Sequence, residues 1–129
     1  MDEICFRENI GLLAYSPLAF GQLTGKYIDN PKTHGRLTLF YSDWNAHYRR
    51  PAVLEATRQY MQLARDHGIT PAQLALAWCY SRWFIDATII GGTRPEHLKE
   101  NIDAISISLS DEVIDHINEI HAMITNPAL

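Results

Sequence analysis

The chain has 129 residues, a net charge of −4 and 47% hydrophobic residues, which suffices for one globular domain with its own core. Its 11 Lys and Arg residues are scattered, so no basic stripe could neutralise a nucleic-acid backbone. No run approaches the roughly 20 apolar residues of a membrane span, and the acidic start lacks the apolar core of a signal peptide. We therefore expect a cytoplasmic protein whose partners include neither nucleic acid nor membrane.

Cysteine and histidine spacing does not indicate a metal site. Cys5 and Cys79 are far apart and form no CxxC motif, so buried thiols that behave as small hydrophobes are expected rather than a disulfide. His116 and His121 are five residues apart on one predicted helix, which turns them to different sides. We predict no bound metal.

The residue pattern in the first third of the chain predicts the end of a helix, then a strand and then a long loop. Residues 1–9 resemble the end of a helix, with Ile4 and Cys5 facing inward. Residues 10–15 form a nearly continuous apolar run, typical of a strand buried on both faces of a parallel sheet. Residues 16–50 show no sustained period, and loops of that length are usually functional or mobile.

Two helices are predicted in the middle of the chain. Pro51 opens the first, whose apolar residues follow helical spacing, and Gly68 closes it. Thr70 and Gln73 then form a capping box around a proline, so a second helix should run to about Arg82. The expected inward residues are Val53, Ala56, Tyr60, Met61 and Ala64 on the first helix, and Leu74, Ala75, Ala77 and Trp78 on the second.

A strand, a tight turn and a helix start follow in sequence. Residues 87–90 are largely β-branched and too few for a helix, and the run stops at two glycines. Thr93 precedes Glu96 by three residues, the spacing of a capping box, and Pro95 suits the first turn. The helix should extend from about Pro95 to about Ala104.

This turn also has the composition of an anion site. Gly91 and Gly92 allow the backbone to approach a ligand closely, and the free N–H groups of a helix start favour negative charge. Arg94 adds a guanidinium. The residues predict a binding site for a phosphate-sized anion, although an ordinary turn between strand and helix would use much the same residues.

The last helix is capped by Ser110 and carries Asp111 and Glu112 in its first turn, which favours the helix dipole. Its expected inner stripe consists of Ile114, Ile117, Ile120, His121 and Ile124. The order of strand, helices, strand, helices is that of a parallel α/β protein. Two parallel strands alone leave both edges of the sheet open, so we expect that the complete fold contains further strands.

Two motifs resemble aldo-keto reductases. Residues 13–27, LAYSPLAFGQLTGKY, resemble the strand-seven signature of that family, and residues 89–101, IIGGTRPEHLKEN, resemble its strand-eight phosphate loop. The helix PAQLALAW lies between them, as in the family, and the likeness extends over essentially the whole chain. It is closest to the bacterial branch that also resembles potassium-channel β subunits. The implied structure is the C-terminal portion of a (β/α)₈ TIM barrel, with residues 1–129 as one partial oxidoreductase domain.

The resemblance implies an NADP(H) site and assigns its residues. Tyr15 would lie against the nicotinamide ring. Thr93 would lie near the 2′-phosphate, with Glu100 and Asn101 towards adenine. Lys26 would place a positive charge at the pyrophosphate. The complete implied set is Tyr15, Ser16, Pro17, Leu18, Ala19, Gly21, Lys26, Arg36, Gly91, Thr93, His97, Glu100 and Asn101. Barrels of this kind often bind phosphate with the loops after strands seven and eight, in agreement with the anion site inferred above.

Two positions of this chain depart from the motifs of the aldo-keto reductase family. Many relatives carry Ser or Arg where this chain has Thr93, and Gln where it has His97. Thr93 retains a hydroxyl and His97 could donate as Gln does, so the resemblance still favours NADP(H) over NAD(H). Three loop aromatics, Tyr41, Trp44 and Tyr48, could border the substrate as in the family, or could cover an exposed edge of the core.

The family's catalytic set, an Asp, a Tyr, a Lys and a His, lies on the first four strands of the barrel. A barrel of this type needs about 250 residues, and this chain begins near the end of the sixth βα unit. No catalytic residue can therefore be assigned here. We read the chain as the C-terminal part of a reductase, truncated naturally or in its gene model.

The resemblance leaves three readings open. The first is the cofactor-binding end of an NADP(H)-dependent reductase of aldehydes or ketones, inactive without the missing strands. The second is a non-catalytic nucleotide-binding or oligomerising module that pairs with itself or with a complementary barrel part. The third is a remnant that forms no stable protein.

Overall fold

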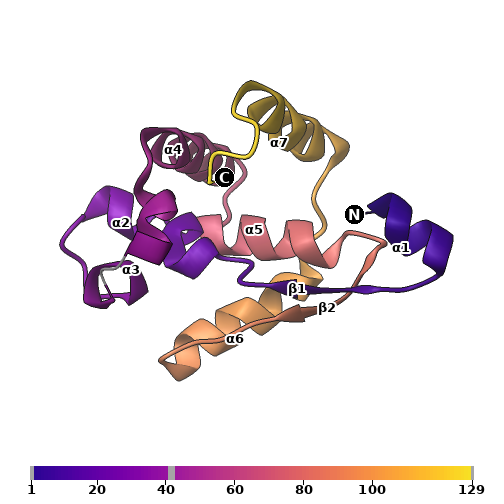
Figure 1. The fold of residues 1–129 in the computed structure, drawn as a ribbon, viewed down its shortest axis with the longest axis horizontal. Coiled ribbons are helices and arrows are strands. Elements are labelled where there is room, and N and C mark those ends of the chain that lie inside the picture. Colours follow the sequence, from indigo (N-terminus) through magenta and orange to yellow (C-terminus); the bar gives the residue numbers. More distant parts are fainter. Residues whose placement is uncertain (1, 41–42, 129) are drawn as a thin grey trace.

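A computed structural model describes residues 2–40 and 43–128 of the chain, with the side chains of residues 43 and 44 left out of the description. Figure 1 shows a central helix, α5, with two strands on one side and two further helices on the other. The elements are α1 Asp2–Glu8, β1 Leu12–Tyr15, η1 Ala19–Thr24, α2 Lys26–Asp29, α3 Arg36–Leu39, η2 Asp43–Arg49, α4 Pro51–Asp66, α5 Pro71–Tyr80, β2 Ile85–Ile89, α6 Pro95–Asp103, η3 Ala104–Ser106 and α7 Asp111–Met123.

The two strands form a parallel pair, which confirms the predicted α/β order. Tyr15 is opposite Ile89, and the register shifts once, between Leu12 and Leu13. Strand β2 begins two residues earlier than expected and ends at Ile89. Among the described residues no third strand joins the pair. A pair of parallel strands agrees with the expectation of an incomplete barrel.

Strand β1 is buried on one face, and the prediction that both faces are buried is wrong. The side chains of Leu13 and Tyr15 are 64% and 71% exposed, whereas Leu12 and Ala14 are half-buried. Helix α5 contacts β2 and covers the half-buried face. The other face lacks a covering layer in the described part of the chain, so every second side chain of β1 remains exposed.

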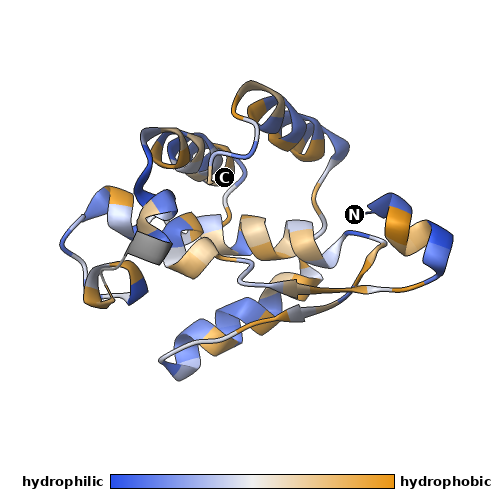
Figure 2. Cartoon of the chain, in the orientation of Figure 1, coloured by the Kyte–Doolittle hydropathy of each residue, from blue (hydrophilic) through white to orange (hydrophobic). Residues whose placement is uncertain are grey.

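Helix α5 is the centre of the core. Its start is fixed by the predicted capping box, in which Thr70 and Gln73 each accept a hydrogen bond from the other residue's N–H. Leu74, Leu76 and Ala77 are all buried, because α5 packs against α4 as well as the sheet. Figure 2 shows apolar colour along most of its length. A helix buried on several sides needs apolar residues around most of its circumference.

Helices α4 and α7 pack together over α5. Their shared core consists of Leu63, Ala64, Leu74, Val113, Ile117 and Ile120. The observed Ser110 cap of α7 confirms the predicted helix start. His121 and Ile4, however, are exposed, and their predicted inward positions are wrong, because the core lies on a narrower stripe of each helix. None of the helices within residues 2–40 and 43–128 is long and apolar enough to cross a bilayer.

Residues 16–50 are not a structureless loop, as their composition suggested. Their described part forms the short helical segments η1, α2, α3 and η2. Gln22 is buried and its side-chain amide donates to Thr57 of α4 at 3.4 Å. The backbone N–H of Leu37 donates to the Tyr27 hydroxyl at 3.2 Å. These hydrogen bonds hold residues 16–50 in a defined conformation. The spacing of apolar residues in the sequence does not predict them.

Candidate functional site

The predicted site residues lie on two segments that leave the sheet at the same edge. Because β1 and β2 are parallel and Tyr15 pairs with Ile89, the chain after each strand starts from neighbouring positions. In α/β folds of this kind ligands bind at the carboxyl ends of the strands. The geometry therefore brings the two predicted loops to the end of the sheet where a ligand is expected.

The first segment has an unusual backbone. Ser16, Ala19 and Phe20 have φ values of 56°, 48° and 58°, and Gly21 follows at 86°. The Ser16 carbonyl accepts from the Ala19 N–H at 2.8 Å, and its hydroxyl accepts from the Phe20 N–H at 3.3 Å. Residues with positive φ other than glycine cost on the order of 1–3 kcal/mol each and cluster at functional sites. Pro17 and Leu18 lie inside this tight turn.

Two cations flank the turn. Lys26 begins α2, and its ammonium lies between two glycines, since a Cβ added to Gly21 or Gly35 would be 3.4 Å or 2.7 Å from Nζ. Arg36 begins α3, and its guanidinium carbon lies 5.1 Å from the centroid of the Phe20 ring. In the described part of the chain neither cation has a carboxylate within 4.0 Å. Both charges are thus available to an anion.

Aromatic rings gather beside the same turn. The rings of Phe20 and Tyr48 lie 5.2 Å apart between centroids, and His47 and Tyr48 lie 4.2 Å apart. Burial, and then the neighbouring Tyr15 hydroxyl, raise the pKa of Tyr48. The exposed Tyr15 ring therefore has a second aromatic residue near it. Of the other loop aromatics considered above, Tyr41 and the Trp44 side chain lie outside the described residues.

The second segment differs from the sequence prediction in its helix cap, although the helix starts at Pro95 as expected. The cap of α6 is Arg94, with no side-chain hydrogen bond, so the predicted capping box of Thr93 and Glu96 is wrong. The physical reason is Pro95, which restricts the preceding residue to extended conformations. Arg94 is extended, with φ −137° and ψ 147°, and the helix begins one residue later than the box requires. Thr93 consequently lies outside the helix, and its side chain is exposed.

Asn101 holds this turn in place. It is only 3% exposed, and its side-chain amide donates to the Gly91 carbonyl at 3.2 Å. The Tyr80 hydroxyl of α5 donates to the Asn101 carbonyl at 2.9 Å. The end of β2 is thereby tied to the helix that follows it. Gly91 itself has open space around the position of a Cβ, which leaves its backbone accessible.

Glu100 has a partner on another helix. Its carboxylate accepts from the Thr70 hydroxyl at 2.6 Å, at the start of α5. The positive end of that helix dipole favours the charge of Glu100. His97, one turn earlier on α6, is exposed, and its Cβ is 3.2 Å from a Cβ built on Gly92.

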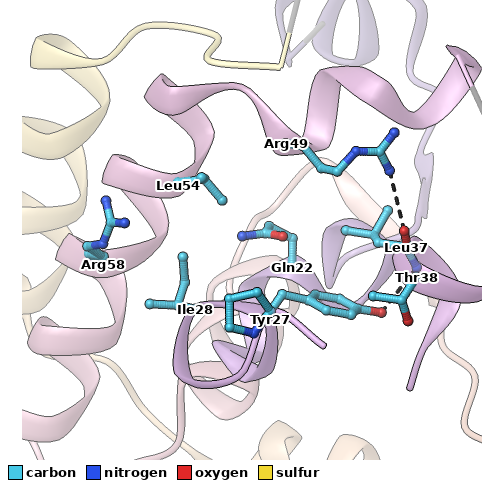
Figure 3. A pocket seen from close by; sticks show the side chains of 9 residues that line it. Gln22, Tyr27, Ile28, Leu37, Thr38, Arg49, Leu54 and Arg58 are labelled. Carbon is cyan, nitrogen blue, oxygen red and sulfur yellow. Dashed lines mark hydrogen bonds between the residues drawn. The ribbon is translucent and has the colours of Figure 1, made fainter. Parts of the chain in front are cut away.

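Two hollows lie elsewhere in the described structure. One, of about 240 Å³, lies beside residues 27–38 and is shown in Figure 3, where the Arg49 guanidinium donates to the Leu37 carbonyl at 3.3 Å. The other, of about 330 Å³, includes Phe6, Trp83 and Asp86 near the amino ends of the strands. Neither contains a cluster of catalytic groups. No group of three or more His, Cys, Asp or Glu in the described ranges is arranged to hold a metal.

The two loops carry groups of the kinds that bind phosphate and aromatic rings. Lys26 and Arg36 carry positive charge, Tyr15 offers an exposed aromatic face, and the α6 start adds N–H donors. These groups lie on the two segments that leave the same edge of the sheet. When bound, a nicotinamide cofactor would supply the hydride for a redox reaction.

Comparison with known proteins defines the class of the fold. The chain superposes on the glycerol dehydrogenase of Gluconobacter oxydans with a TM-score of 0.71 at 24% identity, over 94% of this chain and 37% of that one. That enzyme is a barrel of the aldo-keto reductase type. The chain has the fold of part of a (β/α)₈ barrel.

The chain belongs to the aldo/keto reductase family, whose sequence profile matches residues 1–122. It is 37% identical over 126 residues to the protein Tas of Escherichia coli, and 35% identical over 115 residues to a putative voltage-gated potassium channel subunit beta of Schizosaccharomyces pombe. These alignments cover 98% and 85% of this chain. The chain spans 36% and 33% of the length of these two relatives.

Three residues of the site region were not found by sequence reasoning. Phe20 contacts both Arg36 and Tyr48, Thr70 bonds Glu100, and Gly35 leaves room for the Lys26 ammonium. Phe20 lies inside the motif, and its position between two assigned residues was a usable signal. The contacts of Thr70 and Gly35 join distant parts of the chain and give no local signal.

Proposed function

We propose that this chain is the cofactor-binding end of an NADP(H)-dependent aldo/keto reductase that transfers hydride to an aldehyde or ketone. The observation that carries the proposal is the pair of cations, Lys26 and Arg36, beside the strained turn at the end of β1, where no carboxylate of the described residues pairs with either. Membership of the aldo/keto reductase family supports hydride transfer as the proposed reaction. The protein would act in the cytoplasm, with residues 1–129 as one partial reductase domain.

The individual roles follow the family resemblance. Tyr15 would face the nicotinamide ring. The residues that would follow the pyrophosphate are Ser16, Pro17, Leu18, Ala19 and Gly21. Lys26 and Arg36 would neutralise phosphate, while Gly91, Thr93, His97, Glu100 and Asn101 would hold the adenosine end. Thr93 and the adjacent Arg94 support a preference for the 2′-phosphate of NADP(H). The proton donor and its partners would come from strands that this chain does not contain, so we expect no reductase turnover by the chain alone.

Titration of the purified chain with NADPH, followed by nucleotide fluorescence, tests the cofactor site. Lys26→Met and Arg36→Met remove one phosphate-facing charge each and should weaken binding several-fold, more at low salt. Lys32→Met is the matched control, because Lys32 is an exposed lysine outside the turn, and it should change little. Equal effects of all three substitutions, or no measurable binding by the chain or by a completed barrel, would reject the assigned site.

A second function is favoured by the exposed strand face. The chain could bind nucleotide without catalysis and act as a module that pairs with another polypeptide. Leu13 and Tyr15 support this reading because exposed apolar strand residues favour association. A strictly monomeric species in sedimentation, alone and with candidate partners, would count against it.

A further inference from the structure

The hollow near the amino ends of the strands is lined by aromatic rings. The rings of Phe6 and Trp83 lie 6.1 Å apart between centroids, with an angle of 87° between their planes. The rings of Trp83 and Phe84 lie 5.6 Å apart at 84°. Phe6 and Trp83 are 75% and 65% exposed, although large aromatic side chains are usually well buried. Much of the ring surface is therefore open to a ligand.

A carboxylate shares this hollow with the rings. Asp86 lies against Gly11, since a Cβ added to Gly11 would be 1.8 Å from Oδ2 of Asp86. Only glycine leaves the space that this carboxylate occupies. The backbone N–H of Leu12 donates to the Phe84 carbonyl at 2.9 Å, which holds the two chain segments side by side at the hollow.

The chain does not neutralise the charge of Asp86. Among the residues that the structure describes, no Lys, Arg or His nitrogen lies within 4.0 Å of its carboxylate. The two arginines next in sequence to lining residues have other partners. Arg7 pairs with Glu3 at 2.7 Å, and the guanidinium carbon of Arg82 lies 5.1 Å from the centroid of the Trp78 ring. The negative charge is thus available to a cation from outside the chain.

We propose that this hollow binds an organic ammonium group. The faces of aromatic rings attract a cation electrostatically, and sets of such rings recognise choline and methylated lysine in proteins. Asp86 supplies the opposite charge beside the rings. The volume of about 330 Å³ lies in the range of small-molecule pockets, which is about 300–1,000 Å³.

A metal ion fits this hollow less well than an organic cation. Calcium and magnesium ions take about six or more oxygen ligands. Asp86 is the one carboxylate among the described residues that line the hollow, and most of the other lining side chains are apolar. Aromatic and aliphatic walls suit the carbon substituents of an alkylammonium group.

The proposed ammonium site is separate from the candidate nucleotide site. In Figure 1 it lies at the end of the sheet next to α1, whereas the nucleotide loops leave the opposite ends of β1 and β2. The inference therefore goes beyond the proposed function and does not depend on it. Choline and NADPH should bind without competition, and competition between them would contradict this placement.

Titration of the 129-residue chain with choline, followed by amide NMR signals, tests the site. Choline should shift the signals of residues 9–11 and 83–86. The matched probe is 3,3-dimethylbutanol, which has the shape of choline without its charge and should bind about tenfold more weakly or less. Equal affinity for the two probes would overturn the proposal, because an ordinary apolar surface does not distinguish them.

Two substitutions separate the charge from the rings. Asp86→Asn fits the same space beside Gly11 and should weaken choline binding about tenfold, with no loss for 3,3-dimethylbutanol. Trp83→Leu should weaken the binding of choline by a similar factor. Glu119→Gln, at an exposed carboxylate on α7, is the control and should change neither affinity. Unchanged choline affinity in Asp86→Asn or in Trp83→Leu would overturn the proposal.

A peptide that carries trimethyllysine distinguishes the two sources of an ammonium group. Tighter binding of this peptide than of choline would support the site and assign the group to a modified protein. Tighter binding of choline would support the site and assign the group to a free small molecule. Absence of signal shifts with both probes would overturn the proposal.

Discussion

The hydroxyl of Thr70 donates to the carboxylate of Glu100 at 2.6 Å, across 30 residues of sequence, and so joins the start of α5 to α6. The same hydroxyl accepts from the Gln73 N–H at 3.1 Å as the helix cap. One side chain therefore completes a helix end and fixes an oxygen of a carboxylate in the candidate nucleotide site. The other carboxylate oxygen remains available to a ligand.

Replacing Thr70 by Val should destabilise the chain and weaken binding of the adenosine half of the cofactor. Loss of the cap alone costs about 0.5–2 kcal/mol, so denaturant melts should show a drop of this order. Binding of adenosine 2′,5′-bisphosphate should weaken, whereas nicotinamide mononucleotide, which lacks adenine, should bind as before. Thr70→Ser keeps the hydroxyl and should preserve both the free energy of unfolding and the affinity for adenosine 2′,5′-bisphosphate. Equal losses for both ligands would assign Thr70 a structural role only.

Replacing Asn101 by Asp should destabilise the turn after β2. The amide donates to the Gly91 carbonyl, whereas a buried carboxylate has no proton to donate and repels that oxygen. Leaving such a buried group unsatisfied costs about 1–3 kcal/mol, measured by urea unfolding. Asn118→Asp, at an exposed position of α7, is the control and should change stability by less than about 0.5 kcal/mol. Similar losses from the two variants would contradict the role assigned to Asn101.

Gly91→Ala separates stability from ligand binding. No atom lies within 4 Å of the added Cβ, so the free energy of unfolding should stay level or rise slightly. A phosphate that approaches the backbone closely would meet the new methyl group, and we expect binding of adenosine 2′,5′-bisphosphate to fall about tenfold, equivalent to about 1.4 kcal/mol. Isothermal titration measures this. Unchanged affinity would place the ligand away from Gly91.

Stability should decrease at alkaline pH. Burial raises the pKa of Tyr60 above its ordinary value of 10.0, and burial first, then Cys79, raises that of Tyr80. The folded state therefore holds these protons more tightly than the unfolded state. Their contribution is fully present below pH 10 and is lost as the pH rises through the folded-state pKa values. Urea midpoints from pH 8 to 11 should fall, and less steeply in Tyr60→Phe. An identical slope in that variant would exclude Tyr60 as a source.

The sequence alone determined most of the local structure. The helix caps Thr70 and Ser110 were readable because a cap acts through hydrogen bonds within three residues. The helix start at Pro51 was readable because proline suits the first turn. The parallel order of the strands followed from the alternation of short apolar runs and helices. The two motifs also identified the family, and with it the candidate cofactor residues.

Only the tertiary structure decided how those local pieces meet. It shows which face of β1 is exposed. The exposure of a strand face depends on which elements pack on it and cannot be read from the residues of the strand alone. The tertiary structure joins Thr70 to Glu100 and places Arg36 over Phe20, contacts between residues that no local period relates. Short-range hydrogen bonds depend on neighbouring residues and can be predicted from the sequence, whereas packing depends on the whole folded chain.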